Sequence, residues 1–252
     1  MQIGLIWDID GVVVDSPHEQ AWRTTAMKDP WNVEDLTSDF YFAHVASRPR
    51  HEGGNNILEL KGVYERLGAR TNEERHQLLQ EYSEEKNRLI GELIDAGKFR
   101  IYPDAVTLLL KSREKGILQA AASASKNARR MLMRVSRSRI IKEVSNDYGV
   151  LKEEASLYSI FDVDACGLDL QGKREILSFA GHKLHTLSGT RIKTMVVFED
   201  APSGIEAAKS LGYCAIGILR IGTKSALEQA GADVVTQDLS TMTVEDLLQM
   251  AK

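Results

Sequence analysis

The stretch Ile3–Ser16, IGLIWDIDGVVVDS, contains the most informative pattern in the chain. Its first five residues, Ile3–Trp7, are apolar and stop abruptly at an acid, which is typical of a parallel strand buried on both faces. Asp8 and Asp10 are separated by one residue, and the two-residue period of an extended chain aims both carboxylates the same way. Gly11 permits a sharp turn directly afterwards. A buried strand therefore leads into a close pair of acids.

A close pair of carboxylates at a strand end has two chemical uses. The two charges repel each other, and a hard cation such as Mg²⁺ relieves that repulsion. A carboxylate can also attack phosphorus and form an aspartyl-phosphate. A turn at the end of a strand, with both acids solvated, can have the same Asp-x-Asp-Gly sequence. This short motif alone therefore leaves a reactive site and a solvated turn both open.

Apolar runs similar to the first recur later in the chain, at Ile117–Ala122, Met195–Phe198 and Cys214–Leu219. A helical pattern over Ala105–Lys115 lies between the first run and Ile117–Ala122, and Gly116 is a plausible helix stop. This alternation predicts an α/β fold with a doubly wound, Rossmann-like parallel sheet. Ligands of such sheets bind beyond the carboxyl ends of the strands, so the polar residues that follow each run are the candidate site residues.

Residues 17–100 lack any buried-strand run and have helical patterns instead, at Asn56–Leu67 and Asn72–Ala96. A T-x-x-E spacing at Thr71–Glu74 predicts a helix-starting capping box, and an S-x-x-E spacing at Ser203–Glu206 predicts another. The sequence therefore predicts a smaller helical domain inserted after the first strand.

The expected domain boundaries follow from these patterns. Residues 1–16 and 101–252 are expected to form the α/β core domain, and residues 17–100 the inserted α-helical cap domain. The charged stretch Arg134–Glu154 is expected to be helical and solvated, and no chemistry is assigned to it.

A second polar segment is AAASASKN, Ala120–Asn127. Its apolar run ends at Ser123, and Ser125, Lys126 and Asn127 follow at an expected helix N-terminus. Free backbone N–H groups, hydroxyls and a lysine at that place make an anion site. Simple helix capping by serine or asparagine uses the same residue types, so both interpretations stay open.

Two further segments complete the set. In VVFEDAPSG, Val196–Gly204, the adjacent acids Glu199 and Asp200 follow a buried run and offer oxygen ligands to Mg²⁺. A charged loop before a helix is the simpler explanation. Lys173 in LQGKRE is a single lysine, for which a solvated surface position is the default.

In chain order these segments supply an acid pair, a hydroxyl, a lysine and a second acid pair, the parts that phosphoryl transfer needs. They resemble the four signature motifs of the haloacid dehalogenase superfamily across nearly the whole chain. The resemblance implies that Asp8 is the nucleophile and Asp10 the general acid and base. It also implies that Ser123 and Lys173 bind the transferring phosphate.

The same resemblance implies a Mg²⁺ cofactor. Its ligands are expected to be Asp8, the main-chain carbonyl of Asp10, and acids of the Glu199–Asp200 pair. Asp10 disfavours dehalogenation, because the dehalogenases themselves lack an acid at that position. One departure from the family lies after Lys173, where Arg-Glu-Ile-Leu replaces the usual Pro-Ala-Pro-Asp.

A closer resemblance is to the β-phosphoglucomutase group. The segment SASKN is similar to one that grips the distal, non-transferring phosphate in that group, and HEQAW contains a counterpart of its hinge histidine. SRPRHEGG, Ser47–Gly54, and the pair Lys86–Asn87 resemble parts of its cap. The substrate-binding residues that this resemblance implies are His18, Arg50, Lys86, Ser125, Lys126 and Asn127.

We therefore expect a Mg²⁺-dependent sugar phosphomutase that converts β-glucose 1-phosphate to glucose 6-phosphate through an aspartyl-phosphate. A sugar-phosphate phosphatase of the same superfamily is the alternative, with water as the final acceptor. A catalytically silent binding protein on the same fold is a third possibility, because fold does not determine function.

The composition restricts the kinds of binding partner and the cellular location that we expect for this protein. The net charge is -4 and the pI about 5.9, so the basic footprint of a nucleic-acid-binding protein is lacking. Cys166 and Cys214 do not make a disulfide framework. No apolar run approaches the roughly 20 residues of a membrane span, and no signal peptide is recognised. We expect a cytoplasmic monomer or weak homo-oligomer whose partner is a small phosphorylated sugar.

Overall fold

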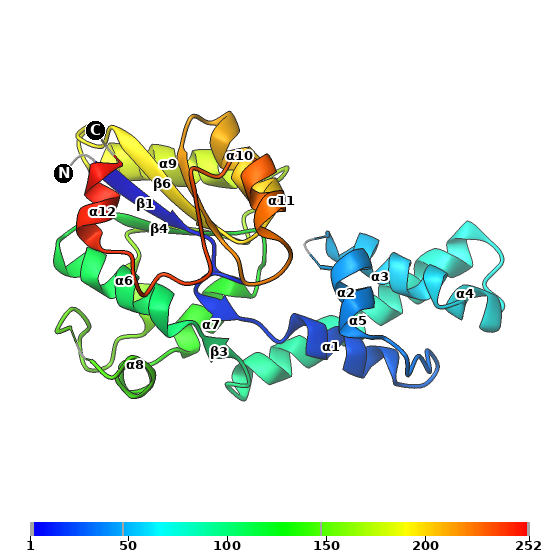
Figure 1. Ribbon diagram of the computed structural model, residues 1–252. Helices are drawn as coiled ribbons and strands as arrows, with labels where there is room; N and C mark the ends of the chain where they lie inside the picture. The colour runs from blue at the N-terminus through cyan, green and yellow to red at the C-terminus, as the bar shows by residue number, and fades with distance from the viewer. Residues whose placement is uncertain (1–2, 47, 147, 251–252) are drawn as a thin grey trace. The chain divides into compact units, whose positions relative to one another are not determined.

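The computed structural model describes residues 3–46, 48–146 and 148–250 (Figure 1). The chain divides into two compact units. The first, here called the core unit, comprises Met1–Asp15 and Arg100–Lys252; the second, the helical unit, comprises Ser16–Phe99. Each unit is described by itself below.

The core unit is built on a six-stranded parallel sheet with the strand order β5-β4-β1-β6-β7-β8. The predicted α/β class with a parallel sheet is confirmed. The strands are β1 (Ile3–Trp7), β4 (Gln119–Ser123), β5 (Val163–Cys166), β6 (Thr194–Glu199), β7 (Cys214–Ile218) and β8 (Val234–Thr236).

The strand order places a topological switch point at the centre of the sheet. From β1 the chain moves to β4 and β5 on one side, and it later returns to β6 and continues to β7 and β8 on the other side. The carboxyl ends of β1 and β6 therefore flank the point where the winding reverses. In open α/β sheets this is where ligands bind.

Helices cover both faces of this sheet. Figure 1 shows α9 and α10 on one side and α6 and α12 on the other. Apolar side chains of α9 and α10, such as Leu177 and Ile205, pack with Ile6 and Val197 of the central strands. The core-unit helices are α6 (Pro103–Glu114), α7 (Ala128–Arg134), α8 (Arg137–Val144), the 3-10 helix Leu157–Ile160, α9 (Lys173–Leu187), α10 (Pro202–Ser210), α11 (Lys224–Gln229) and α12 (Val244–Gln249).

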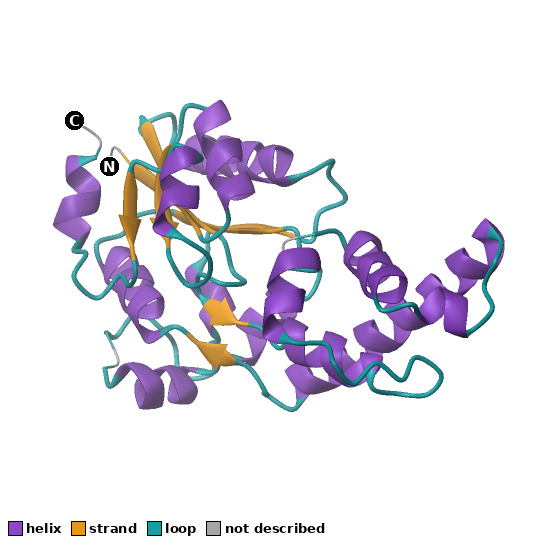
Figure 2. Ribbon diagram, turned by 45° about the vertical axis from the view of Figure 1, so that its right-hand side comes forward, coloured by secondary structure: helices purple, strands orange, loops and turns teal. Residues whose placement is uncertain are grey.

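Two short strands, β2 (Val14–Asp15) and β3 (Arg100–Ile101), pair antiparallel apart from the main sheet (Figure 2). The side chain of Arg100 donates to Asp15 Oδ2 from both Nη2, at 2.6 Å, and Nε, at 3.1 Å. The core-unit ends of the two chain segments that lead to the helical unit are therefore held together by backbone pairing and an exposed ion pair.

The helical unit contains α1 (His18–Ala26), α2 (Ser38–His44), α3 (Arg50–Leu60), α4 (Val63–Arg66) and α5 (Asn72–Asp95). Its core contains a group of aromatic rings: the ring centroids of Trp22 and Tyr82 lie 5.4 Å apart, and those of Trp31 and Tyr82 lie 5.1 Å apart. The Tyr82 hydroxyl donates to the Trp22 carbonyl oxygen at 3.3 Å, which satisfies the one polar group of that buried ring. Across the part of the chain that the structure describes, no helix combines the length and apolar character that crossing a bilayer requires.

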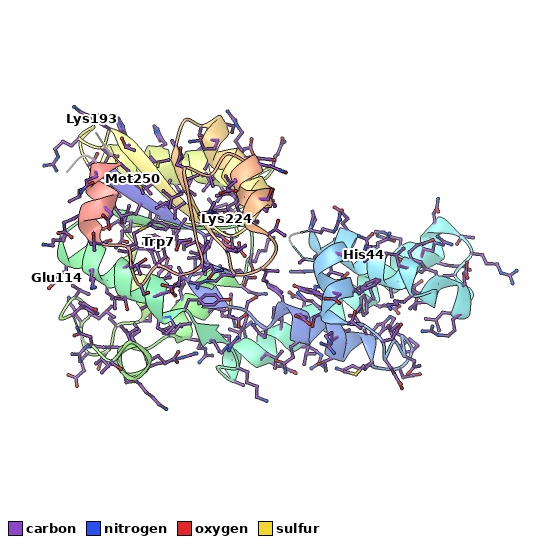
Figure 3. All side chains as sticks on the ribbon, viewed as in Figure 1. Trp7, His44, Glu114, Lys193, Lys224 and Met250 are labelled. Atoms are coloured by element: carbon purple, nitrogen blue, oxygen red, sulfur yellow. The ribbon has the colours of Figure 1, made fainter. Side chains whose placement is uncertain are left out.

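A buried polar contact joins the first strand to its neighbour just before the acid pair. Trp7 stacks on Phe198 with ring centroids 3.8 Å apart, and its indole Nε1–H donates to Gln119 Oε1 at 2.9 Å. Gln119 Nε2 in turn donates to the Leu109 carbonyl oxygen at 3.0 Å. Trp7 and Gln119 have no exposed surface, and Figure 3 shows Trp7 inside the core unit.

Trp7→Phe is expected to lower the free energy of unfolding by about 1–3 kcal/mol, because Gln119 Oε1 would then be buried without a donor. Gln119→Leu should also destabilise, since it leaves the buried indole N–H of Trp7 unpaired and removes one of the hydrogen bonds to the Leu109 carbonyl oxygen. The double variant should lose less than the sum of the two single losses, because both ends of one hydrogen bond are removed together. Urea unfolding of the four proteins measures this coupling. Strict additivity would show that the contact contributes nothing.

Candidate active site

Three acids gather at the switch point of the sheet. Asp8 directly follows β1, and its backbone N–H donates to the Phe198 carbonyl oxygen of β6 at 2.9 Å. Glu199 ends β6, and Asp200 follows it. Carboxylate oxygens of Asp8, Glu199 and Asp200 all lie within 4.8 Å of one another. Two predicted acid pairs that are far apart in sequence therefore contribute to one cluster.

Lys173 is the cation of this cluster. It is the first residue of α9, and its Nζ donates to Asp8 Oδ1 at 2.6 Å and to the Ala122 carbonyl oxygen at 3.3 Å. The same Nζ lies 2.8 Å from Glu199 Oε2. The ammonium group thus contacts both acids.

Two glycines allow the acids to approach so closely. Gly11, at φ +83°, lies against the Asp200 carboxylate, and a Cβ at this position would overlap it. Gly204, in the first turn of α10, lies against the Glu199 carboxylate in the same way. Sequence reasoning identified Gly11 only as a turn residue and missed Gly204. The close approach of Gly204 depends on the fold, so its position four residues after the acid pair was the only sequence signal.

Among the described residues, the three carboxyl groups of the cluster outnumber the one positive charge that contacts them, the ammonium group of Lys173. Burial raises the pKa of Glu199 to about 7 and raises that of Asp8 above its ordinary value, against the opposing effect of Lys173. Burial and the neighbouring Glu199 and Asp8 hold the pKa of Asp200 well above its usual range. One lysine therefore does not balance three acids. An all-oxygen set of this kind fits a hard divalent cation such as Mg²⁺, which could be held by these carboxylates.

Asp10 lies in the tight turn that follows the first acid. The turn is closed by Gly11 N–H donating to the Val14 carbonyl oxygen at 2.8 Å and by Val14 N–H donating to the Ile9 carbonyl oxygen at 2.9 Å. The charge of Asp10 contributes to the raised pKa of both Asp8 and Asp200. Asp10 is therefore close enough to act electrostatically on the cluster.

The predicted anion segment forms a loop at the carboxyl end of β4. Ser123 is buried, and its Oγ accepts from the Ser125 N–H at 3.2 Å. Ser125 Oγ accepts from the Asn127 N–H at 3.2 Å. Asn127 is the N-cap residue of α7 but its side chain makes no capping bond, and Lys126 is exposed.

The remaining predicted site residues belong to the helical unit. His18 begins α1, and its Nδ1 lies 2.8 Å from Nζ of Lys86, a buried residue of α5. Burial and the cations Lys86 and Arg50 hold the pKa of His18 well below its ordinary value, so a neutral imidazole can accept from the ammonium group. Lys86 Nζ also lies 4.8 Å from the Trp22 ring centroid, a cation–π contact. Arg50 is exposed at the start of α3, and Ser47 of the predicted cap segment lies outside the described residues.

Mg²⁺ is expected to raise the melting temperature of the protein. A ligand that binds only the folded state at 100 times its dissociation constant adds about 2.7 kcal/mol, or roughly 5–10 °C for a chain of this size. Differential scanning fluorimetry with and without chelator measures the shift. Asp200→Asn should remove most of it, whereas Glu206→Gln, at an exposed acid of α10, should keep it. An equal shift in Asp200→Asn would exclude Asp200 as a ligand.

The sequence matches the family described as haloacid dehalogenase-like hydrolase over residues 4–212. Two 2-deoxyglucose-6-phosphate phosphatases of Saccharomyces cerevisiae are each 47% identical to it over 58 residues, which is 23% of this chain. The matched stretch spans 24% of each of these curated relatives, about a quarter of their length.

Among solved structures, the chain is similar to an archaeal β-phosphoglucomutase from Pyrococcus sp. strain ST 04. That match has 36% identity and a TM-score of 0.79, and it covers 99% of this chain and 98% of the other. A β-phosphoglucomutase from Clostridium difficile shares the fold, with 22% identity, a TM-score of 0.66, and coverage of 100% and 97%.

Proposed function

The chain belongs to the haloacid dehalogenase-like hydrolase family, and we propose that it is a Mg²⁺-dependent sugar phosphomutase that converts β-glucose 1-phosphate to glucose 6-phosphate. The observation that carries the phosphoryl-transfer chemistry is the contact of Lys173 Nζ with both Asp8 and Glu199. The choice of a phosphomutase is supported by the similarity to the Pyrococcus β-phosphoglucomutase over nearly the full length of both chains.

The proposed reaction begins at Asp8, whose carboxylate attacks the phosphorus of a phosphorylated donor and forms an aspartyl-phosphate. Asp10 protonates the leaving sugar oxygen and later accepts the proton of the attacking sugar hydroxyl. Ser123 and Lys173 hold the oxygens of the transferring group, because hydrogen-bond donors and a cation stabilise the charge that develops there. Asp8, Glu199 and Asp200 would hold Mg²⁺, which would neutralise part of the negative charge at the site.

A mutase must also hold the second phosphate of its bisphosphate intermediate. We assign this task to Arg50 and to the Ser125–Asn127 loop with its exposed Lys126. A guanidinium group binds phosphate through two parallel hydrogen bonds, and an ammonium group adds a point charge. His18 and Lys86 are assigned to substrate binding in the helical unit, where their contact holds both side chains in one place.

Arg50→Ala and Lys126→Ala are each expected to reduce the mutase rate by about 10- to 100-fold, the loss of one hydrogen bond to a charged group. Hydrolysis of p-nitrophenyl phosphate, which has no second phosphate, should stay within about threefold. A coupled glucose 6-phosphate assay and a colorimetric assay give the two rates, with Lys193→Ala as an exposed control. Equal losses in both activities would contradict the role assigned to these residues.

A sugar-phosphate phosphatase is the second candidate, supported by the 47% identity to the yeast 2-deoxyglucose-6-phosphate phosphatases over 58 residues. It would use the same aspartyl-phosphate and end with attack by water in place of a sugar hydroxyl. Steady release of inorganic phosphate from a sugar phosphate, without transfer to a second hydroxyl, would favour this candidate.

A further inference from the structure

Gly167 packs directly against the backbone of the Ser125–Asn127 loop. It follows β5 at the carboxyl end of the sheet, and its N–H donates to the Ser123 carbonyl oxygen at 2.8 Å. A Cβ placed on Gly167 would lie 2.7 Å from the Cα of Lys126 and 3.2 Å from its Cγ. There is therefore no room for any side chain between the two loops.

The loop of Lys126 cannot easily move aside to make this room. The contact is with a main-chain atom, so a change of side-chain rotamer does not relieve it. The turn is also held by two internal hydrogen bonds, Ser125 N–H to Ser123 Oγ and Asn127 N–H to Ser125 Oγ, both 3.2 Å long. A larger residue at position 167 would have to displace the backbone of Lys126.

The same glycine also begins the connection to the acid cluster. Five residues separate it from Lys173, whose ammonium group donates to Asp8. Gly167 has a φ of +63°, a left-handed conformation that glycine adopts without strain. Along the chain, Gly167 thus begins the segment that leads to Lys173. In space, it packs against Lys126 of the Ser125–Asn127 loop.

We propose that Gly167 is a positioning residue that sets the backbone of Lys126 for binding the second phosphate of a bisphosphorylated sugar. This inference rests on the proposed function, because it takes Lys126 as part of the grip on that phosphate. It predicts that a substitution at Gly167 weakens binding of a sugar bisphosphate more than binding of a sugar monophosphate.

The test is isothermal titration calorimetry in the Asp8→Asn background, which does not require turnover. The measured quantity is the ratio of affinities for β-glucose 1,6-bisphosphate and glucose 6-phosphate in the presence of Mg²⁺. Gly167→Ala is expected to lower this ratio at least about tenfold. Combining it with Lys126→Ala should lower the ratio no further than Lys126→Ala alone, because both changes remove one interaction.

Gly189→Ala is the matched control. Gly189 has a similar φ of +59°, but a Cβ there meets nothing within 4 Å. Both alanines would have to adopt a left-handed φ, so the strain of that φ is matched, whereas only a Cβ at position 167 meets Lys126. Gly167→Asn is the second variant, because asparagine tolerates a left-handed conformation and still places a Cβ against Lys126.

The outcomes separate the two levels of the proposal. Suppose that Lys126→Ala lowers the affinity ratio, while Gly167→Ala or Gly167→Asn leaves it at the value of Gly189→Ala. The role assigned to Gly167 is then wrong, but Lys126 still binds the second phosphate. If Lys126→Ala itself leaves the ratio unchanged, Lys126 does not bind the second phosphate, and the assignment of Gly167 is overturned together with that part of the proposed function.

Discussion

Asp8→Asn is expected to lower the turnover of both p-nitrophenyl phosphate and β-glucose 1-phosphate by at least about 10⁴-fold. An amide does not attack phosphorus and cannot form the acyl-phosphate that the proposed reaction passes through. The side chain keeps its size, and its amide oxygen can still accept from Lys173 Nζ, which now lies 2.6 Å from Asp8 Oδ1. The protein should therefore stay folded, with a circular dichroism spectrum like that of the wild type.

The matched control is Asp169→Asn, at an exposed acid of the loop that precedes Lys173. Its rates should stay within about twofold of the wild type, because surface substitutions away from a site have small effects. If Asp8→Asn kept more than about 1% of the wild-type rate, a different group would be the nucleophile. The cluster at the switch point would then need another chemical role.

Lys173→Met is expected to lower both the free energy of unfolding and the catalytic rate. The methionine fills a similar volume but leaves the buried carboxylates of Asp8 and Glu199 without their cation. Removing one partner of a buried ion pair costs roughly 3–5 kcal/mol, which lowers the melting temperature of a chain of this size by about 6–20 °C. The effect should be measured in the presence of chelator, because a bound cation compensates part of the charge. Lys193→Met, at the exposed lysine labelled in Figure 3, is the control and should be nearly neutral.

The loss in Lys173→Met should depend on pH in a defined direction. Burial raises the pKa of Glu199 from 4.5 to about 7 on folding, so the folded, metal-free protein binds more protons than the unfolded chain between these values. Stability therefore falls as the pH rises through this window, and Lys173 limits the fall. Thermal unfolding should show a larger penalty for the variant at pH 8 than at pH 5. A penalty that is equal at both values would contradict the proposed pairing.

The sequence predicted the central strands because their side chains are apolar on both faces. Ile3–Trp7 was predicted to be a strand and is observed as β1. The acids that follow it lie at the switch point of the sheet. Strands β5 and β8 were missed for two reasons. Asp164 interrupts the apolar run of β5, and β8 is only three residues long.

Helix starts show where local patterns are sufficient and where they fail. The capping box predicted at Thr71–Glu74 is confirmed, with both reciprocal hydrogen bonds present. The one predicted at Ser203–Glu206 is wrong, because Pro202 occupies the first helical position and makes Ala201 the N-cap residue. The fixed φ angle of Pro202 therefore determined where the helix begins, in spite of the S-x-x-E spacing one residue later.

Glycines account for other differences between prediction and structure. The predicted helix Asn56–Leu67 is two helices, because Gly62 adopts a φ of +63° between α3 and α4. The first of these begins earlier than expected, at Arg50, and contains Gly53 and Gly54, which disfavour a helix in isolation. A Cβ on Gly54 would press on Leu79 and Trp22, so close packing compensates for the weak propensity.

The stretch Arg134–Glu154 was predicted to be helical. Among its described residues, Arg134 ends α7, Arg137–Val144 form α8, and the others lie outside helices. Ser145 ends that helix in a left-handed conformation, with a φ of +59°. Serine is not among the residues that usually adopt this conformation at a helix end, so the sequence carried no standard stop signal there.

The candidate site was predicted residue by residue from motif order, but its physical character was not. Nothing in the sequence shows that Lys173 contacts two acids at once, or that Gly204 brings the Glu199 carboxylate into the cluster. The same is true of the contact between Gly167 and Lys126. Each of these contacts joins segments that are brought together only by the winding of the sheet.

The decisive measurement for the proposed function is ³¹P NMR of the purified protein with Mg²⁺, β-glucose 1-phosphate and a trace of β-glucose 1,6-bisphosphate, beside an Asp8→Asn sample. We predict that the glucose 6-phosphate resonance grows as that of β-glucose 1-phosphate declines, and that neither changes in the variant. Inorganic phosphate as the sole product would contradict the mutase assignment, and conversion that persists in Asp8→Asn would contradict the aspartyl-phosphate.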